Sequence, residues 1–180
     1  MALQRVRNDF YPSPTKLIQS WLAIPENRKH FGDNDTFLEC CDGEGAITDV
    51  LRSYGYDVEA TDIVDSPDYD ATTGEYWRYR QPDWVFTNPP FNQATLIIDH
   101  ALENCKKGVV MILRSTYLEP CKDRRHLLDN RISNISYVNP RPRFRSDTGH
   151  TDLCTVVFIT WLKHKTNPTQ AVSYLTDWNR

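Results

Sequence analysis

The chain has 180 residues, of which 39% are apolar, and a formal net charge of −3. This length predicts about one domain, and no apolar run reaches the roughly 18 residues that a membrane span needs. A net negative charge is not typical of a protein that binds nucleic acid tightly. The start of the chain lacks a secretory pattern, and the five cysteines form no C-x-x-C pair. We therefore expect a cytoplasmic protein with reduced cysteines and no metal site.

Helices and strands are predicted to alternate along the chain. A helix is expected over Pro14–Ile24, with Ser13 as its N-cap and Pro14 at its first position. Strands are expected over 36–41, 56–61, 83–87, 107–113, 134–138 and 153–162, and further helices over 45–54, 92–105 and 122–130. This alternation predicts a mostly parallel sheet with helices on both faces.

The last predicted strand, Cys154–Leu162, is long and apolar and has no helix after it. We expect it to pair antiparallel inside the sheet. Residues 63–80 and 139–151 are expected to form long irregular loops. The tail after Lys163 is expected to pack loosely.

Charge is distributed unevenly between two segments of the chain. Residues 33–70 are acidic, and residues 114–145 are basic. The acidic segment would favour a cationic cofactor, and the basic segment would favour an anionic polymer. A solvated surface with charged helix ends is the alternative interpretation.

A strand, a glycine turn and a helix follow one another from Thr36 onward, with Asp42-Gly43-Glu44-Gly45 as the turn. Glycines allow a tight turn and close approach of a ligand, although they also serve for shape alone. The next strand ends at Asp62, about 20 residues later, where an acid in nucleotide-type folds binds ribose hydroxyls. The full dinucleotide fingerprint is absent. Glu39 and Asp42 make the turn acidic, which disfavours phosphate and favours a cationic ligand.

The segment Asn88-Pro89-Pro90-Phe91 follows the apolar run Trp84–Phe86. Prolines fix φ and have no N–H, so this loop is rigid and rich in acceptors. The Asn88 side-chain carbonyl and the Pro89 backbone carbonyl could together hold one exocyclic amino group, with Phe91 against its ring. The pattern therefore suits chemistry on an amino nitrogen conjugated to a flat ring. A purely structural Pro-Pro loop is the alternative.

Together these motifs resemble class I S-adenosylmethionine-dependent methyltransferases, specifically the small phage-type N6-adenine DNA methyltransferases. The matching stretches are Tyr11–Pro14, Leu38–Ile47, Thr61–Asp62, Asp70–Thr72, Asn88–Phe91, Arg141–Phe144 and Gly149–Asp152. The resemblance implies a Rossmann-like α/β fold with a mostly parallel seven-stranded sheet, an antiparallel last strand and helices on both faces. It also implies one catalytic domain over 1–180, with its core over about 8–162 and no separate target-recognition domain.

The resemblance further implies methyl transfer from S-adenosylmethionine to adenine N6 in DNA that is single-stranded or has its adenine flipped out of the duplex. Catalysis would rest on Asn88, Pro89, Pro90 and Phe91. Cofactor binding would involve Tyr11, Ser13, Glu39, Cys41, Gly43, Gly45, Asp62, Ile63, Asp70 and Asn88, with Glu75 as a rival to Asp70. Substrate contacts would come from Phe91, Arg141, Arg143, Phe144 and Arg145. A virus-encoded enzyme that acts in a host cell would fit this likeness.

Alternative functions remain open at this stage. Asn-Pro-Pro-aromatic loops also serve methyltransferases that modify protein glutamine side chains or guanine N2 of ribosomal RNA. The basic segment 114–145 argues against a protein target. A non-catalytic subunit that keeps cofactor binding is the other alternative, and intact Glu39, Asp62 and Asn88 argue against it.

Overall fold

The structure is a computed structural model in which residues 13–128, 131–142, 155–164 and 170–179 are described. Its strands are β1 (Thr36–Glu39), β2 (Asp57–Ala60), β3 (Trp84–Thr87), β4 (Gly108–Arg114), β5 (Ile132–Asn139), β6 (Val156–Leu162) and β7 (Ala171–Thr176). The α-helices are α1 (Thr15–Ala23), α2 (Ala46–Ser53), α3 (Gly74–Trp77) and α4 (Ala94–Asn104). Short 3₁₀ turns are η2 (Pro25–Arg28), η3 (Pro67–Tyr69), η4 (Ser115–Leu118) and η5 (Lys122–Arg124).

The strands form one seven-stranded mixed sheet in the order β2-β1-β3-β4-β6-β5-β7. β1 pairs parallel with β2 and β3, and β3 pairs parallel with β4. β6 runs antiparallel between β4 and β5, and β7 pairs parallel with β5. The predicted mostly parallel sheet, with the strand ending at Leu162 antiparallel inside it, is confirmed.

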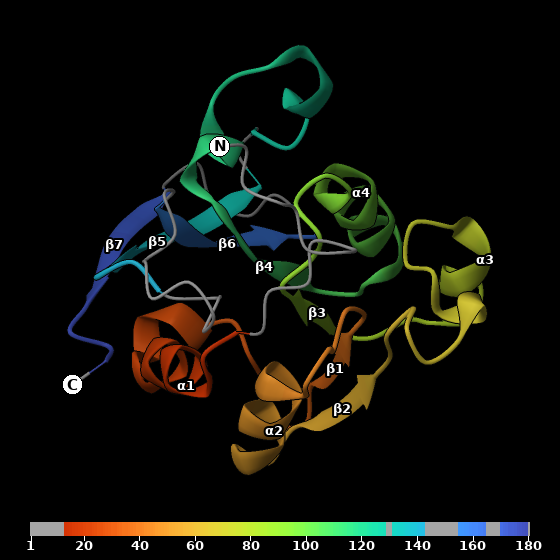
Figure 1. Cartoon of the computed structure of the whole chain (residues 1–180), viewed down its shortest axis with the longest axis horizontal. Coiled ribbons are helices and arrows are strands. Elements are labelled where there is room, and N and C mark those ends of the chain that lie inside the picture. The colour runs from red at the N-terminus through yellow and green to blue at the C-terminus, as the bar shows by residue number, and fades with distance from the viewer. Residues whose placement is uncertain (1–12, 129–130, 143–154, 165–169, 180) are drawn as a thin grey trace, which may run out of the picture.

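Helices cover both faces of the sheet, as predicted (Figure 1). On one face α1 buries Leu17, Ile18, Trp21 and Leu22, and the Trp21 ring stacks on Phe158 of β6 with a centroid distance of 5.1 Å. α2 joins α1 on this face. On the other face α4 packs against alternate residues of β3 and β4, including Val85 and Val109. Because the central strands are buried on both sides, they read as continuous apolar runs.

The helix predictions need two corrections. α1 begins at Thr15, and Pro14 rather than Ser13 is its N-cap, because the Pro14 backbone is extended and its carbonyl accepts the Leu17 amide at 2.9 Å. Residues 122–130 do not form the predicted helix, since only the η5 turn is helical among those described. The Leu127 carbonyl accepts the Trp161 indole N–H instead of a helical amide.

Two segments are more ordered than the sequence indicates. Residues 63–80 contain η3 and α3, and α3 buries Tyr76 and Trp77 against the core. The prediction of a loosely packed tail after Lys163 is wrong, because this tail contains β7, and β6 is therefore the last strand but one. Leu175 and Trp178 are buried, and the Trp178 indole donates to the Pro140 carbonyl at 2.7 Å.

Candidate functional site

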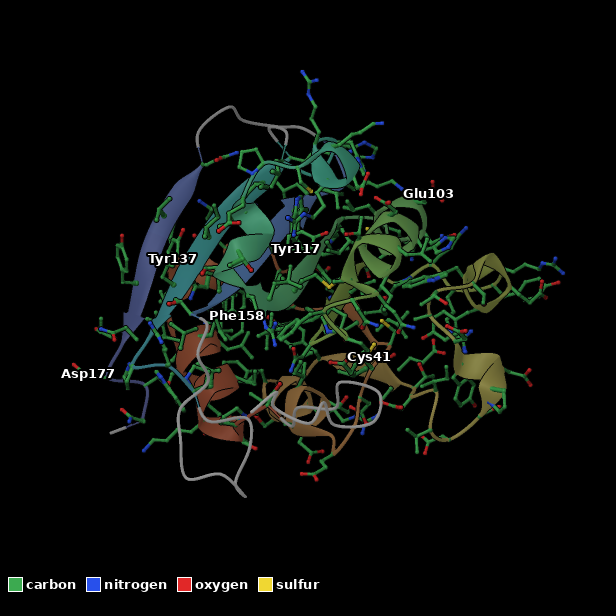
Figure 2. The ribbon with its side chains drawn as sticks, turned by 45° about the horizontal axis from the view of Figure 1, so that its top comes forward. Cys41, Glu103, Tyr117, Tyr137, Phe158 and Asp177 are labelled. Carbon is green, nitrogen blue, oxygen red and sulfur yellow. The ribbon has the colours of Figure 1, made fainter. Side chains whose placement is uncertain are left out.

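The predicted site residues gather at the carboxyl edge of the sheet. The chain passes from β1 to its neighbour β2 and then crosses to β3 on the other side of β1. In open α/β sheets ligands bind at such a switch point, outside the carboxyl ends of the strands. Glu39 ends β1, Asp62 follows β2, and Asn88 follows β3. Cys41, which is labelled in Figure 2, lies just beyond β1 at this edge.

Glu39 is a buried carboxyl group with one unsatisfied oxygen. Its side chain is 1% exposed, and Oε1 accepts the Cys41 amide at 2.8 Å. Oε2 has no hydrogen-bond partner among the described residues. Burial raises the pKa of Glu39 well above its usual range, and the neighbouring Cys41 raises it further. An unpaired buried carboxylate is costly, so this position suits a ligand that brings a cation, such as an ammonium group.

The glycine turn after β1 adopts the conformation that its sequence predicts. Gly43 and Gly45 have φ values of 58° and 80°, in the left-handed region that favours glycine. The Gly43 amide donates to Asp62 Oδ2 at 3.0 Å, so the turn after β1 is tied to the end of β2. The Asp42 carboxylate accepts the Thr48 hydroxyl and holds the start of α2. The turn is therefore shaped before any ligand binds.

Asp62 and Ile63 form a polar and apolar pair beyond β2. Asp62 is half-buried, and Oδ1 accepts the Val64 amide at 2.9 Å. Each carboxylate oxygen can accept a further hydrogen bond, which suits a vicinal diol such as a ribose. The Ile63 side chain is 47% exposed next to it. An exposed apolar side chain beside such a carboxylate suits the flat ring of a nucleoside.

The structure separates Asp70 from its rival Glu75. Asp70 is half-buried, and Oδ1 accepts both the amide and the hydroxyl of Thr72, at 2.9 and 2.6 Å. Glu75 lies on α3 with a side chain that is 69% exposed, and it pairs with Arg78 at 2.8 Å. Asp70 is thus held in place by its own turn, whereas Glu75 faces solvent.

The loop after β3 contacts the start of the chain. Asn88 Nδ2 donates to the Ser13 hydroxyl at 3.0 Å, which joins motifs that are 75 residues apart. The Pro90 carbonyl accepts the Gln93 amide at 2.9 Å. The described residues supply no donor to the Pro89 carbonyl. The loop thus keeps an acceptor at Pro89 and fixes the Asn88 nitrogen toward Ser13.

Arg114 is a site residue that the sequence prediction missed. It ends β4, next to β3 in the sheet, and its guanidinium carbon lies 4.7 Å from the centroid of the Phe91 ring. Phe91 itself is partly buried against the core cluster that includes residues of β4 and α4. The sequence indicates a role for Arg114 in the site only weakly, because Arg114 is one of several arginines in the basic segment 114–145. Its position at the end of an apolar strand after the Asn-Pro-Pro-Phe loop could have suggested it.

The structure of this chain is similar to those of several proteins of known structure. No family model and no curated protein matches the sequence. The M protein of the type I restriction enzyme EcoKI is 13% identical and matches 92% of the chain with a TM-score of 0.62. A class I S-adenosylmethionine-dependent methyltransferase from Listeria monocytogenes is 14% identical and matches 99% with a TM-score of 0.62. The chain has the class I methyltransferase fold.

Restriction-modification proteins recur among the neighbours with this methyltransferase fold. A methyltransferase subunit from Streptococcus thermophilus is 13% identical and matches 91% of the chain with a TM-score of 0.57. The chain spans 48% of the EcoKI protein, 47% of the Streptococcus protein and 69% of the Listeria protein. At these identities the likeness shows the fold, and the Asn-Pro-Pro-Phe loop lies at the carboxyl edge of its sheet.

The remaining predicted residues of the methyltransferase fold divide into two groups. Arg141 is exposed shortly beyond β5, at the same edge of the sheet. Tyr11, Arg143, Phe144 and Arg145 lie outside the described residues. Within the described part, no helix is long and apolar enough to cross a membrane, and no group of His, Cys, Asp or Glu side chains is arranged to hold a metal ion.

Proposed function

We propose that this chain transfers a methyl group from S-adenosylmethionine to the N6 amino group of adenine in DNA. One observation carries the proposal. The Asn88–Phe91 loop lies at the same sheet edge as Glu39 and Asp62, across the switch point between β1 and β3. An amino-group acceptor site and a candidate nucleoside-binding site therefore adjoin each other, as a transfer reaction requires.

The cofactor side of the site fits an aminoacyl nucleoside with a positive charge. The unpaired Glu39 Oε2 suits the methionine ammonium group, and the Gly43–Gly45 turn would lie along the chain of the ligand. Asp62 would accept from the ribose hydroxyls, Ile63 would cover the adenine ring, and Asp70 would accept from its amino group. Ser13, Cys41 and Tyr11 would complete the methionine end. When bound, S-adenosylmethionine supplies an electrophilic methyl group on sulfur.

The target side would act on a poor nucleophile. The lone pair of an adenine N6 nitrogen is delocalised into its ring. Acceptance of its two N–H bonds by the Asn88 side-chain oxygen and the Pro89 carbonyl would favour a pyramidal nitrogen and return the lone pair. The same acceptors stabilise the positive charge that grows on nitrogen in the transition state, so their effect is larger there than in the ground state. The product proton is acidic enough to leave to water, so no strong base is needed.

Phe91 and the basic segment would hold the nucleic acid. The target base would lie against the Phe91 ring, which requires a flipped or single-stranded adenine. Arg141, Arg143 and Arg145 would meet phosphates, and Phe144 would be a second stacking ring. Two proteins with this fold are the M protein of a type I restriction enzyme and the methyltransferase subunit of a type I restriction-modification system, which favours DNA as the polymer. We include in the proposal that one domain suffices, so the recognised sequence should be short.

The test is incubation of the chain and of its Asn88→Ala variant with radiolabelled S-adenosylmethionine against DNA, RNA and protein, followed by nucleoside analysis. We expect N6-methyladenine from DNA and none with the variant. Label on guanine N2 of RNA or on glutamine would show that the methyl group is transferred to one of the alternative substrates instead of DNA adenine. Cofactor binding without transfer to any polymer would indicate a non-catalytic subunit.

A further inference from the structure

We propose that Arg114 binds a backbone phosphate of the nucleic acid next to the target base and so positions that base beside Asn88. This inference rests on the proposed function and extends it. The first observation is the Arg114–Phe91 contact, with the guanidinium carbon 4.7 Å from the ring centroid. A guanidinium in this range is attracted to the negative face of the ring. The side chain is therefore held over the loop that would bind the target amino group.

The second observation is that the Arg114 guanidinium is not otherwise engaged. Among the described residues it contacts the Phe91 ring and makes no hydrogen bond or ion pair, although the chain has 24 acidic residues against 21 basic ones. Two other arginines form ion pairs: Arg78 pairs with Glu75, and Arg80 pairs with Glu59. The N–H donors of this exposed arginine stay available, while the aromatic ring positions the guanidinium group. The side chain is therefore pre-organised to bind an anion. Its planar fork matches a phosphate.

The third observation is the position of Arg114 relative to the loop. In the β3–β4 register Thr87 lies opposite Met111, so both chains continue past the carboxyl edge, one to Phe91 and the other to Arg114. The contact places the positive charge on the target side of the site and away from the acidic turns after β1 and β2. This separation fits a phosphate better than the cofactor, whose binding turns are acidic.

A geometric consequence follows from the stack. The Phe91 ring holds the guanidinium beside the loop that contains Asn88. A phosphate bound by Arg114 would therefore position its nucleotide relative to Asn88. Arg114 would thus affect both DNA affinity and the turnover of bound DNA.

A second arginine–ring pair extends the same surface. Arg124 lies 4.7 Å from the centroid of Tyr117, which sits between β6 and α4 (Figure 2). The Tyr117 hydroxyl bonds Thr95 of α4 at 3.1 Å, so this pair stands on the face of the sheet that also carries Phe91. Unlike Arg114, Arg124 bonds Cys121 Sγ and the Glu119 carbonyl. We therefore assign the phosphate next to the target base to Arg114.

The test compares Arg114→Gln with Arg28→Gln. Arg28 is a matched control because it also lies over a ring, 5.7 Å from the Tyr54 centroid, but next to the far end of α2. Affinity for a labelled oligonucleotide, as duplex and as single strand, is measured across a salt series. Removal of one phosphate contact lowers the log–log salt slope by about 0.9 for duplex and 0.7 for single strand. We expect this in Arg114→Gln, with about tenfold weaker binding and unchanged S-adenosylmethionine affinity, and no slope change in Arg28→Gln.

Arg114→Lys keeps the test decisive if Arg114→Gln fails to fold. It retains the charge but loses the planar fork, so we expect an unchanged salt slope, a several-fold loss of DNA affinity and a lower kcat. Equal slopes and affinities for the wild type and the Arg114 variants, in a wild type that methylates DNA, would overturn this inference alone. A wild type that neither binds nor methylates any nucleic acid would overturn the proposed function and the inference with it.

Discussion

The two halves of the carboxyl edge are organised in different ways. After β1 and β2, most contacts of Asp62 and Asp70 lie within their own turns. Asp62 accepts the Val64 amide, and Asp70 accepts the amide and the hydroxyl of Thr72. The Gly43 amide, 19 residues before Asp62, also donates to Asp62 and joins the two turns after β1 and β2. After β3 and β4, the contacts join distant parts of the chain. Asn88 meets Ser13 across 75 residues, and Arg114 reaches the Phe91 ring from the next strand. The proposed cofactor half, after β1 and β2, is thus organised mainly by local turns, and the proposed target half, after β3 and β4, by contacts across the assembled sheet.

This difference predicts different responses to substitution. If the proposed function is right, side chains in the cofactor half bind the ligand as well as ordering their own turns, so their loss should weaken cofactor binding and lower the stability of the protein. On the same proposal, side chains in the target half bind the reacting nitrogen, so their loss should reduce methyl transfer and leave cofactor binding intact. The predictions below test that division, from the largest expected effect to the smallest.

Asn88→Ala should abolish methyl transfer, with kcat lower by about 100-fold or more, because it removes a pre-organised dipole from the transition state. Cofactor affinity, measured by calorimetry, should stay nearly unchanged. Gln93→Ala is the matched control, since it removes an exposed amide from the same loop and leaves the backbone bond to Pro90. If Asn88→Ala instead lost cofactor binding but kept normal turnover per bound cofactor, the loop would have a structural role. That result would contradict the hypothesis that Asn88 binds the target amino group.

Asp62→Ala should weaken S-adenosylmethionine binding about tenfold or more, because a lost hydrogen bond to a charged group typically costs about 1.5–3 kcal/mol. Asp57→Ala is the control, at the opposite end of the same strand, where the side chain is exposed. Turnover at saturating cofactor should change little. Unchanged calorimetric affinity in Asp62→Ala would remove the ribose assignment.

Glu39 should make the stability of the ligand-free protein depend on pH. Its ordinary pKa of 4.5 is raised well upward in the folded state by burial. Above pH 4.5 the folded protein holds a proton that the unfolded chain has released, so stability falls as pH rises toward the folded pKa, by up to about 1.4 kcal/mol per pH unit. Glu39→Gln should flatten this melting profile, whereas Glu44→Gln, an exposed change in the same turn, should not. A wild-type profile without this slope would contradict a protonated Glu39.

Local patterns predict the structure around Glu39 and Asp62 well and the rest of the molecule less well. The strand, glycine turn and second strand around Glu39 and Asp62 are a short-range unit, and the structure contains it with bounds shifted by a residue or two. The Arg114–Phe91 contact depends on strand register, which the sequence does not state. β7 was missed for a related reason. Most of its residues are small or exposed, so its strand character comes from pairing with β5 rather than from its own pattern.

The smallest expected effect separates Asp70 from Glu75. If Asp70 accepts the amino group of the cofactor adenine, Asp70→Asn should weaken S-adenosylhomocysteine binding about fivefold, because the acceptor oxygen remains and only the charge is lost, at about 1 kcal/mol. The substitution should also reduce the preference for this ligand over its analogue without the 6-amino group. Glu75→Gln should change neither quantity, since Glu75 is exposed and pairs with Arg78. The reverse result would assign the adenine contact to α3, and would mean that the local turn at Asp70 serves only to order the chain between β2 and α3.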